Sequence, residues 1–274
     1  MPDTIAFIGG GNMATSLIGG LLANGHPSAG VAVIEPDADK RAALTERFGV
    51  RAAAAPAELL PQATIWVLAV KPQIMATVVG ELASLAGQVR PLVISIAAGV
   101  PLAALARWLD ADLPLVRSMP NTPALIGAGI TALFAGEHVS ADQCAAAETV
   151  LAGAGETLWV DREDDLDAVT ATSGSGPAYF FAFMEAMQAA AEELGLDREI
   201  ATRLVRQTAL GAARMAVESG DSPTTLRTNV TSPGGTTERA LTILDEGGFD
   251  LLVAEAMRAA AGRSRELAAQ IADQ

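Results

Sequence analysis

Ile5-Ala6-Phe7-Ile8-Gly9-Gly10-Gly11-Asn12-Met13-Ala14 is the stretch that decides the fold, because a short apolar run leads directly into glycines and then into a helical pattern. Its spacing, Gly9-x-Gly11-x-x-Ala14, is that of the dinucleotide-binding fingerprint. Gly9 permits a tight turn, Gly11 lets the backbone approach a pyrophosphate, and Ala14 keeps the helix close to the strand. The free N–H groups and the positive dipole end of that helix would face the phosphates. The stretch predicts a bound dinucleotide, against the simpler interpretation of a plain strand-to-helix turn.

Short β-rich runs alternate with helical stretches up to about residue 160, which is the pattern of a mostly parallel sheet wrapped by crossover helices. Several runs are apolar throughout, as expected for strands covered on both faces. The chain is therefore predicted to begin with an α/β domain of Rossmann type. The expected strands are 4–8, 31–34, 65–70, 92–96, 114–118, 130–135 and 157–160.

The composition changes after Val160, where an acidic patch leads into long Ala-rich helical segments. We expect two domains, a dinucleotide-binding Rossmann domain at 1–160 and an all-α domain at 161–274. The helix that starts at Pro177 is apolar nearly all round, and a small helical domain cannot bury several such helices alone. An interdigitated homodimer is the expected solution, with a compact monomeric bundle as the alternative. The expected helices are 164–172, 177–194, 197–219, 233–246 and 249–272.

Composition excludes several classes of function. A formal net charge of -14 disfavours nucleic acids and anionic membranes, both of which favour a basic patch. No apolar stretch approaches the roughly 20 residues that span a bilayer, and no basic-then-apolar leader precedes the first strand, so we expect a cytoplasmic protein. Cys144 is the single cysteine and only two histidines are present, so neither an internal disulfide nor a metal site is expected. A small-molecule substrate fits best.

Loops that follow three of the expected strands are rich in small residues and proline. Ligands of open parallel sheets bind at the carboxyl ends of the strands, so these loops are expected to meet at the dinucleotide. Small residues let a flat nicotinamide and its ribose lie against backbone, and Lys71 and Asn121 could hydrogen-bond ribose or amide groups. The alternative is that these residues only make turns. The loops contain Ala69-Val70-Lys71-Pro72, Ile96-Ala97-Ala98-Gly99-Val100 and Ser118-Met119-Pro120-Asn121-Thr122-Pro123.

Glu35 follows the second expected strand, where an acidic residue receives the adenosine ribose hydroxyls and repels a 2′-phosphate. Taken alone, Glu35 favours NADH. Lys40 and Arg41 follow closely and could serve a phosphate, so the sequence leaves both NADPH and NADH open.

Two segments interrupt the helical half. Ser173-Gly174-Ser175-Gly176-Pro177 is interpreted as a flexible polar hinge. Asn229-Val230-Thr231-Ser232-Pro233-Gly234-Gly235-Thr236-Thr237 resembles an anion nest, in which the N–H groups of Ser232 to Thr237 would hold a carboxylate. The alternative is an ordinary N-cap formed by Ser232 or Thr231, with Glu238 in the first turn.

These segments, in this order, resemble the Δ1-pyrroline-5-carboxylate reductases, the family that reduces a cyclic imine to L-proline in the last step of proline biosynthesis. The resemblance implies a Rossmann domain followed by a helical dimerisation domain, NADPH or NADH as cofactor, and a homodimer that assembles further into a ring such as a decamer. It runs nearly end to end and includes Phe7 to Met13, Ala69 to Pro72, Ala97 to Val100, Met119 to Pro123, Ser173 to Tyr179, Thr231 to Thr237 and Gly247 to Phe249.

By position, the resemblance implies roles for particular residues. Thr237 would hydrogen-bond the ring nitrogen, Glu163 would lie beside the substrate, and Asn229 would reach the cofactor. Glu35 departs from the small polar residue that many members carry at its position. The residues implied to hold the substrate carboxylate are Ser232, Gly234, Gly235, Thr236 and Thr237. Those implied to line the dinucleotide are Ile8, Gly9, Gly10, Gly11, Asn12, Met13, Ala69, Val70, Lys71, Pro72, Ile96, Ala97 and Ala98.

The chemistry of imine reduction also favours a hydroxyl group as the catalytic side chain. Reduction of a cyclic imine needs a hydride at carbon and a proton at nitrogen, and the iminium form already carries that proton. The helical half has no Lys and no His, which leaves Thr237, Ser232, Tyr179 and carboxylates as candidates. We expect Thr237 to be catalytic, because Tyr179 lies between apolar neighbours, and we expect positioning to supply most of the acceleration.

Other functions remain open on the sequence. Related imine oxidoreductases and β-hydroxyacid oxidoreductases share the two-domain plan. A β-hydroxyacid oxidoreductase would require a lysine in the helical half, and no lysine lies beyond Lys71. A non-catalytic sensor of NAD(P) would keep the fold. Such a sensor would not need a carboxylate-binding turn at Ser232 to Thr237.

Overall fold

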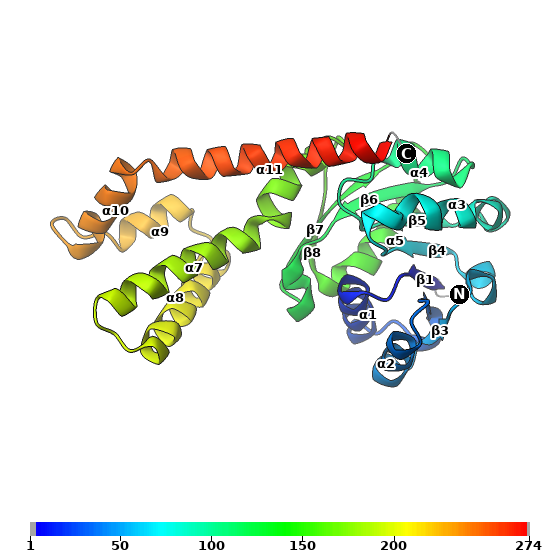
Figure 1. Ribbon diagram of the computed structural model, residues 1–274, viewed down its shortest axis with the longest axis horizontal. Helices are drawn as coiled ribbons and strands as arrows, with labels where there is room; N and C mark the ends of the chain where they lie inside the picture. The colour runs from blue at the N-terminus through cyan, green and yellow to red at the C-terminus, as the bar shows by residue number, and fades with distance from the viewer. Residues whose placement is uncertain (1–3, 273–274) are drawn as a thin grey trace. The chain divides into compact units, whose positions relative to one another are not determined.

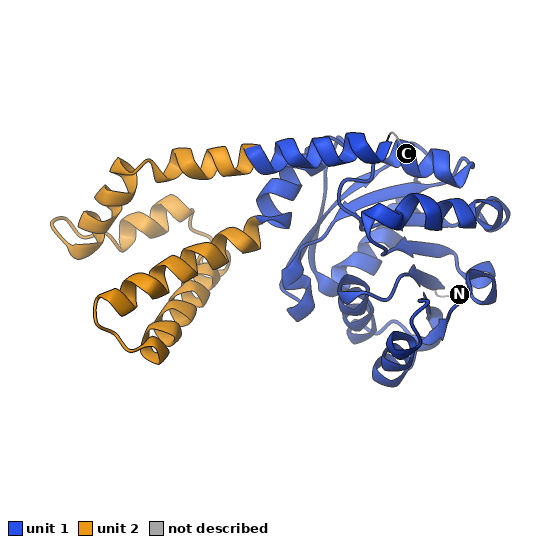
Figure 2. Ribbon diagram, viewed as in Figure 1, with its two compact units in different colours: residues 1–175, 259–274 blue, residues 176–258 orange. Residues whose placement is uncertain are grey.

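The computed structural model describes residues 4–272 and divides into two compact units (Figure 2). The first unit comprises the residues up to Ser175 together with those from Ala259 onward, and the second comprises Gly176–Arg258. Among residues 4–272, no helix combines the length and the apolarity that crossing a lipid bilayer requires.

The first unit is built on one eight-stranded sheet in the order β3-β2-β1-β4-β5-β6-β7-β8 (Figure 1). All neighbouring pairs are parallel except β6 and β7. The seven expected strands are confirmed, and β3 is an additional short edge strand. The bounds are β1 Ile5–Ile8, β2 Val31–Ile34, β3 Arg51–Ala53, β4 Ile65–Leu68, β5 Leu92–Ser95, β6 Leu115–Met119, β7 Gly129–Ala135 and β8 Gly155–Trp159.

Helices cover both faces of this sheet, and each face has its own apolar core. Ala6 and Ile8 of β1 share a core with Met75 of α3. Ile5 and Phe7, whose side chains alternate to the opposite face, belong to the other core. The first core also takes side chains from α4, and the second from α1, α2 and α5. The helices are α1 Asn12–Ala23, α2 Ala38–Phe48, α3 Pro72–Val89, α4 Leu102–Leu109 and α5 Ala141–Leu151. Short 3₁₀ turns lie at Ser28–Gly30, Pro56–Glu58, Leu60–Gln62, Thr122–Ile126 and Ala152–Ala154.

The compact units divide the chain fifteen residues later than the expected boundary at residue 160. Helix α6 (Asp165–Val169) and the π-helical turn Thr170–Gly174 stay with the first unit. Leu166 of α6 is buried there, and the Ser264 hydroxyl donates a hydrogen bond to the Asp167 carboxylate at 2.6 Å. These contacts explain the later division.

The expected hinge at residues 173–177 lies where two helical pieces meet: a π-helical turn ends at Gly174, Ser175 is a bend, and the next helix begins at Gly176, where the second unit also begins. The hydroxyls of Thr170 and Ser173 donate to the carbonyls of Leu166 and Val169 at 2.7 and 3.1 Å. Gly174 allows close packing, since a Cβ added there would lie 2.4 Å from Met119 Cε. A Ser or Thr hydroxyl that donates to a carbonyl of the preceding turn is hydrogen-bonded within the helix, so these residues are compatible with the π-helical turn.

The last part of α11 (Phe249–Ala272) returns to the first unit. Ile271 joins the core that contains α3 and α4. Arg107 of α4 donates a hydrogen bond to the carbonyl of Ala272 at 2.7 Å. Gly99, with φ at +72°, would bring an added Cβ to 3.6 Å from Leu267 Cβ. Residues from the end of the chain thus complete the first core.

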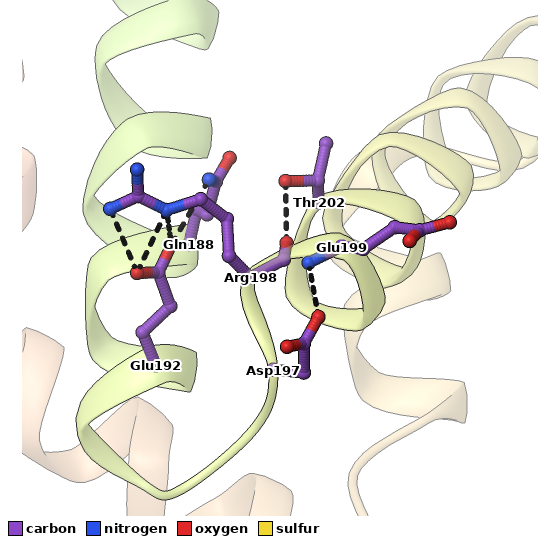
Figure 3. Close-up of polar contacts among 6 residues, drawn as sticks. All are labelled: Gln188, Glu192, Asp197, Arg198, Glu199 and Thr202. Carbon is purple, nitrogen blue, oxygen red and sulfur yellow. Dashed lines mark hydrogen bonds and ion pairs between the residues drawn. The ribbon is translucent and has the colours of Figure 1, made fainter.

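The second unit contains helices α7 to α10 and the first part of α11. Its α7–α8 connection is fixed by polar contacts (Figure 3). Arg198 donates to the Glu192 carboxylate at 3.2 Å, and this hydrogen bond holds the pKa of Glu192 below its ordinary value. Asp197 caps α8 by accepting from the Glu199 N–H at 2.8 Å. The bounds are α7 Gly176–Glu193, α8 Arg198–Glu218, α9 Pro223–Asn229 and α10 Thr236–Glu246, and of these α9 was not expected.

Many large apolar side chains of the second unit are exposed to solvent. Phe180 is 72% exposed, Phe181 60% and Leu252 66%, whereas Ala201 and Val205 are among its few buried apolar residues. Large apolar side chains exposed in this number are typical of a protein–protein interface. The described chain alone does not enclose a core within this unit.

Candidate functional site

The turn after β1 has a conformation that requires glycine at its first position. Gly9 has φ at +105°, and a Cβ added there would lie 2.8 Å from the carbonyl oxygen of Ala69. The Gly9 N–H donates to the carbonyl of Ile34 at 2.8 Å, which ties the turn to the end of β2. Both the turn and the neighbouring loop after β4 are therefore fixed by close backbone contact.

The start of α1 presents free backbone donors beside open space. Gly11 is the N-cap in an extended conformation, with no side-chain cap, and a Cβ added there would meet no atom within 4 Å. The N–H groups of Asn12 and Met13 begin the helix and have no acceptor within it. A helix N-terminus with this free space fits the pyrophosphate of a dinucleotide.

The predicted loops are brought to the same edge of the sheet. Strands β1, β4 and β5 are neighbours and parallel, so the segments that follow them lie at one edge. Lys71 is the exposed N-cap residue of α3, and Pro72 begins that helix. Ala97 is buried and Ala98 is exposed. The half-buried residues of this set are Ala69, Val70 and Ile96.

Glu35 lies at the end of β2 against the glycine turn. Its side chain is buried, and one carboxylate oxygen, Oε2, accepts from the Gly10 N–H at 2.9 Å. The other, Oε1, accepts from the Asp37 N–H at 3.1 Å. The Gly10 N–H is thus bonded within the protein, and the free donors at this turn are those that begin α1.

The Asn121 side chain is hydrogen-bonded to the backbone of two other segments. Its side-chain oxygen accepts from the Ile130 N–H at 3.0 Å, and its Nδ2 donates to the carbonyl of Ser173 at 3.2 Å. Both ends of the buried amide are bonded to backbone, and the expected bond of Asn121 to a ribose or amide group of the dinucleotide stays a prediction.

Glu163 lies in the first unit and is held in an ion pair. Its Oε1 accepts from Arg117 Nη1 and from the Leu102 N–H, both at 2.8 Å. The Arg117 side chain is 7% exposed and the Glu163 side chain 24%. This carboxylate partners a buried arginine, and the expected place of Glu163 beside the substrate stays a prediction. Sequence reasoning missed Arg117, although a charged residue inside the apolar run of β6 signals a buried partner.

The second predicted site is the turn between α9 and α10. Gly234 has φ at +72°, and Gly235 is the N-cap of α10 without a side-chain cap. The interpretation of Ser232 or Thr231 as N-cap is therefore wrong, and α10 begins at Thr236 rather than at 233. The Thr231 hydroxyl instead donates to the carbonyl of Arg227 at 2.6 Å.

This turn holds a carboxylate of the chain itself. Glu238 Oε2 accepts from the Gly234 N–H at 2.7 Å. The N–H groups of Thr236 and Thr237 begin α10 and have no acceptor within the helix. Thr237 is half-buried, and within the described residues its hydroxyl makes no hydrogen bond. Asn229 ends α9 and is exposed. The turn thus combines one backbone hydrogen bond to a carboxylate of the chain with a free hydroxyl.

Comparisons with known proteins cover both units. Residues 163–267 match the family model described as pyrroline-5-carboxylate reductase dimerisation, and residues 4–99 match the model described as NADP oxidoreductase coenzyme F420-dependent. The dimerisation model begins close to the expected boundary after residue 160.

Full-length relatives give the same result. The chain is 51% identical to a pyrroline-5-carboxylate reductase of Pseudomonas aeruginosa, over 97% of each protein. A solved pyrroline-5-carboxylate reductase of Coxiella burnetii is 44% identical, with a TM-score of 0.93 over 97% of this chain and 99% of that one. The Plasmodium falciparum pyrroline carboxylate reductase, solved with NADP bound, is 28% identical, with a TM-score of 0.85 over 97% and 98%. By fold, motifs and identity along its length, the chain belongs to the pyrroline-5-carboxylate reductase family.

Proposed function

We propose that this protein is a reductase that uses NADPH or NADH to convert 1-pyrroline-5-carboxylate to L-proline. The turn from Gly234 to Thr237 carries this proposal, because its Gly234 N–H bonds the Glu238 carboxylate, the N–H groups of Thr236 and Thr237 have no acceptor within α10, and the Thr237 hydroxyl is free. Relatives that match over their whole length bear the name of this activity.

The first unit would hold the dinucleotide. The N–H groups of Asn12 and Met13 would bond the pyrophosphate, and Gly11 leaves the space for it. Lys71 and the small residues at 96–98 would line the nicotinamide half. When bound, the reduced nicotinamide supplies a hydride to the imine carbon, and the carbon–nitrogen double bond of the substrate becomes single.

The turn before α10 would hold the substrate. Its carboxylate would accept from the N–H groups of Gly234, Thr236 and Thr237, since the Gly235 N–H already donates to the carbonyl of Ser232 at 3.0 Å. Glu238 would then give up its bond to the Gly234 N–H. The protonated ring nitrogen would donate to Thr237 Oγ1. Since that nitrogen already carries its proton, Thr237 orients the ring and no strong acid is needed. Asn229 would reach the cofactor, as the family resemblance implies.

We further propose that the protein is a homodimer. The matched dimerisation model supports a homo-oligomer, and the exposed Phe180, Phe181 and Leu252 provide apolar surface that a second copy would cover. Assembly of dimers into a ring such as a decamer is part of the proposal, and sedimentation velocity tests it. A stable, active monomer would contradict the dimer. A cytoplasmic location is also proposed, in keeping with the lone cysteine.

The activity is tested by following nicotinamide absorbance after pyrroline-5-carboxylate is added with NADH or with NADPH, and by identifying the product. Oxidation of at least one cofactor with formation of proline is expected. No oxidation with either cofactor would reject the assignment. Thr242→Val is a matched control for variants at Thr237, because it removes a hydroxyl from the same helix, where that hydroxyl only bonds the Glu238 carbonyl.

A further inference from the structure

The carboxylate of Glu35 is fixed in place beside the glycine turn. The residue is 7% exposed, and its two oxygens accept from the N–H groups of Gly10 and Asp37. A Cβ added at Gly10 would lie 3.3 Å from Glu35 Oε2, so the carboxylate lies directly against the turn. Two backbone donors orient a carboxylate but do not remove its charge.

Arg41, one of the two basic residues that follow Glu35, is already engaged. Arg41 Nη1 donates to the carbonyls of Glu35 and Pro36, both at 2.7 Å. The pKa of Asp37 is lowered, chiefly by a hydrogen bond from the Lys40 N–H, and the charges of Lys40 and Arg41 also lower it. Asp37 is therefore ionised at neutral pH, and its side chain accepts from the backbone N–H groups of Asp39 and Lys40. Residues 35–41 hold three carboxylates, at positions 35, 37 and 39, against two basic side chains.

In a sheet of this topology, the adenosine ribose of a dinucleotide lies at the end of the second strand, about 20 residues after the glycine fingerprint. Glu35 occupies this position. A carboxylate there accepts hydrogen bonds from free ribose hydroxyls, whereas a 2′-phosphate would bring a second anion to the same place. Moving Glu35 away would break its bonds to Gly10 and Asp37.

We propose that Glu35 selects NADH over NADPH in this enzyme by fixing a carboxylate where the 2′-phosphate of NADPH would lie. The inference rests on the proposed binding of a nicotinamide dinucleotide by the first unit.

The test measures dissociation constants of NADH and NADPH for the full-length protein by isothermal titration calorimetry, without substrate. NADH is expected to bind at least about tenfold more tightly, a difference of about 1.4 kcal/mol. Glu35→Gln keeps the size and removes the charge, and it should bring the two constants to within about threefold of each other, mainly by tighter NADPH binding. Glu46→Gln, an equal change of charge at an exposed position of α2, should leave the wild-type ratio unchanged.

Salt provides a second measurement on the wild-type protein alone, so the test does not depend on folding of the variant. Raising the ionic strength screens the repulsion between Glu35 and the 2′-phosphate, so the affinity for NADPH should rise relative to the affinity for NADH. If Lys40 and Arg41 instead bound the 2′-phosphate, NADPH would lose relative to NADH. That loss, wild-type binding of NADPH as tight as that of NADH, or an unchanged ratio in a folded Glu35→Gln protein would each overturn the inference. Failure to bind either dinucleotide would reject the proposed function itself.

Discussion

Substitution of Gly11 by alanine is expected to weaken dinucleotide binding while leaving the stability of the fold nearly unchanged. Gly11 has φ at -71° and ψ at -178°, a conformation that any residue adopts, and an added Cβ would meet no protein atom within 4 Å. Alanine is a poorer N-cap than glycine by several tenths of a kcal/mol, but it lowers the entropy of the unfolded chain by about 0.4–1 kcal/mol. We therefore expect the free energy of unfolding to change by less than about 1 kcal/mol.

The same methyl group would occupy space that we assign to the pyrophosphate. Forcing one additional methyl group into a packed site costs about 1–3 kcal/mol, which corresponds to a roughly 5- to 150-fold higher dissociation constant. Gly9→Ala should behave differently, because φ at +105° and a contact of 2.8 Å with the Ala69 oxygen strain the protein itself. We expect Gly9→Ala to lower the melting temperature, by about 2–4 °C for each kcal/mol lost.

Calorimetric titration with NADH and thermal unfolding without ligand distinguish these effects. Gly80→Ala is a matched control, since it adds a methyl group in open space within α3. It should leave the dissociation constant unchanged. If Gly11→Ala binds NADH with the wild-type constant, the pyrophosphate does not approach Gly11, and the reasoning from free space to cofactor site fails.

Three further predictions concern the two units separately. Thr237→Val should lower kcat about tenfold or more, the equivalent of one hydrogen bond to a charged group, and leave NADH binding unchanged; unaltered turnover would remove Thr237 from its role. Glu163→Gln leaves the buried Arg117 without its charge partner and should lower the free energy of unfolding by about 1–3 kcal/mol in urea titrations. Asp164→Asn, at an exposed pair, should have little effect. The lowered pKa of Glu192 stabilises the fold above its ordinary pKa of 4.5, and this contribution is lost as the pH falls through the folded-state value. Glu192→Gln should therefore melt below the wild type at pH 7, and the two melting curves should converge in acid; a constant difference at every pH would contradict the assigned cause.

The sequence predicted the sheet well where strands are buried on both faces, because runs such as Ile65–Leu68 leave no polar alternative. It missed β3, since Arg51–Ala53 has no β-branched residue and lies at the edge of the sheet. It also missed α9, whose threonines have low helix propensity and whose start depends on the Ser222 cap. Both short elements are decided by their neighbours rather than by local pattern.

The candidate site was predictable where backbone conformation dictates the residue, and less so where side chains choose between partners. Gly9 and Gly234 have positive φ, a conformation that favours glycine, so the glycines in these motifs predicted the two turns. Asn121 and Glu163 bear polar groups that suit a ligand equally well. Their partners Ile130, Arg117 and Ser173 lie 9, 46 and 52 residues away in sequence, and no local pattern reveals those pairings.

The return of α11 to the first unit constrains the order in which a newly made chain can fold. Ile271 belongs to the core of that unit, and the Arg107 side chain bonds the carbonyl of Ala272. A growing chain generally folds from its N-terminus as it leaves the ribosome. Here the sheet must wait, with part of its apolar face uncovered, while the whole second unit is translated. During that interval the apolar side chains that pack against Ile271 stay uncovered, and transiently exposed apolar surface makes a folding chain prone to aggregate.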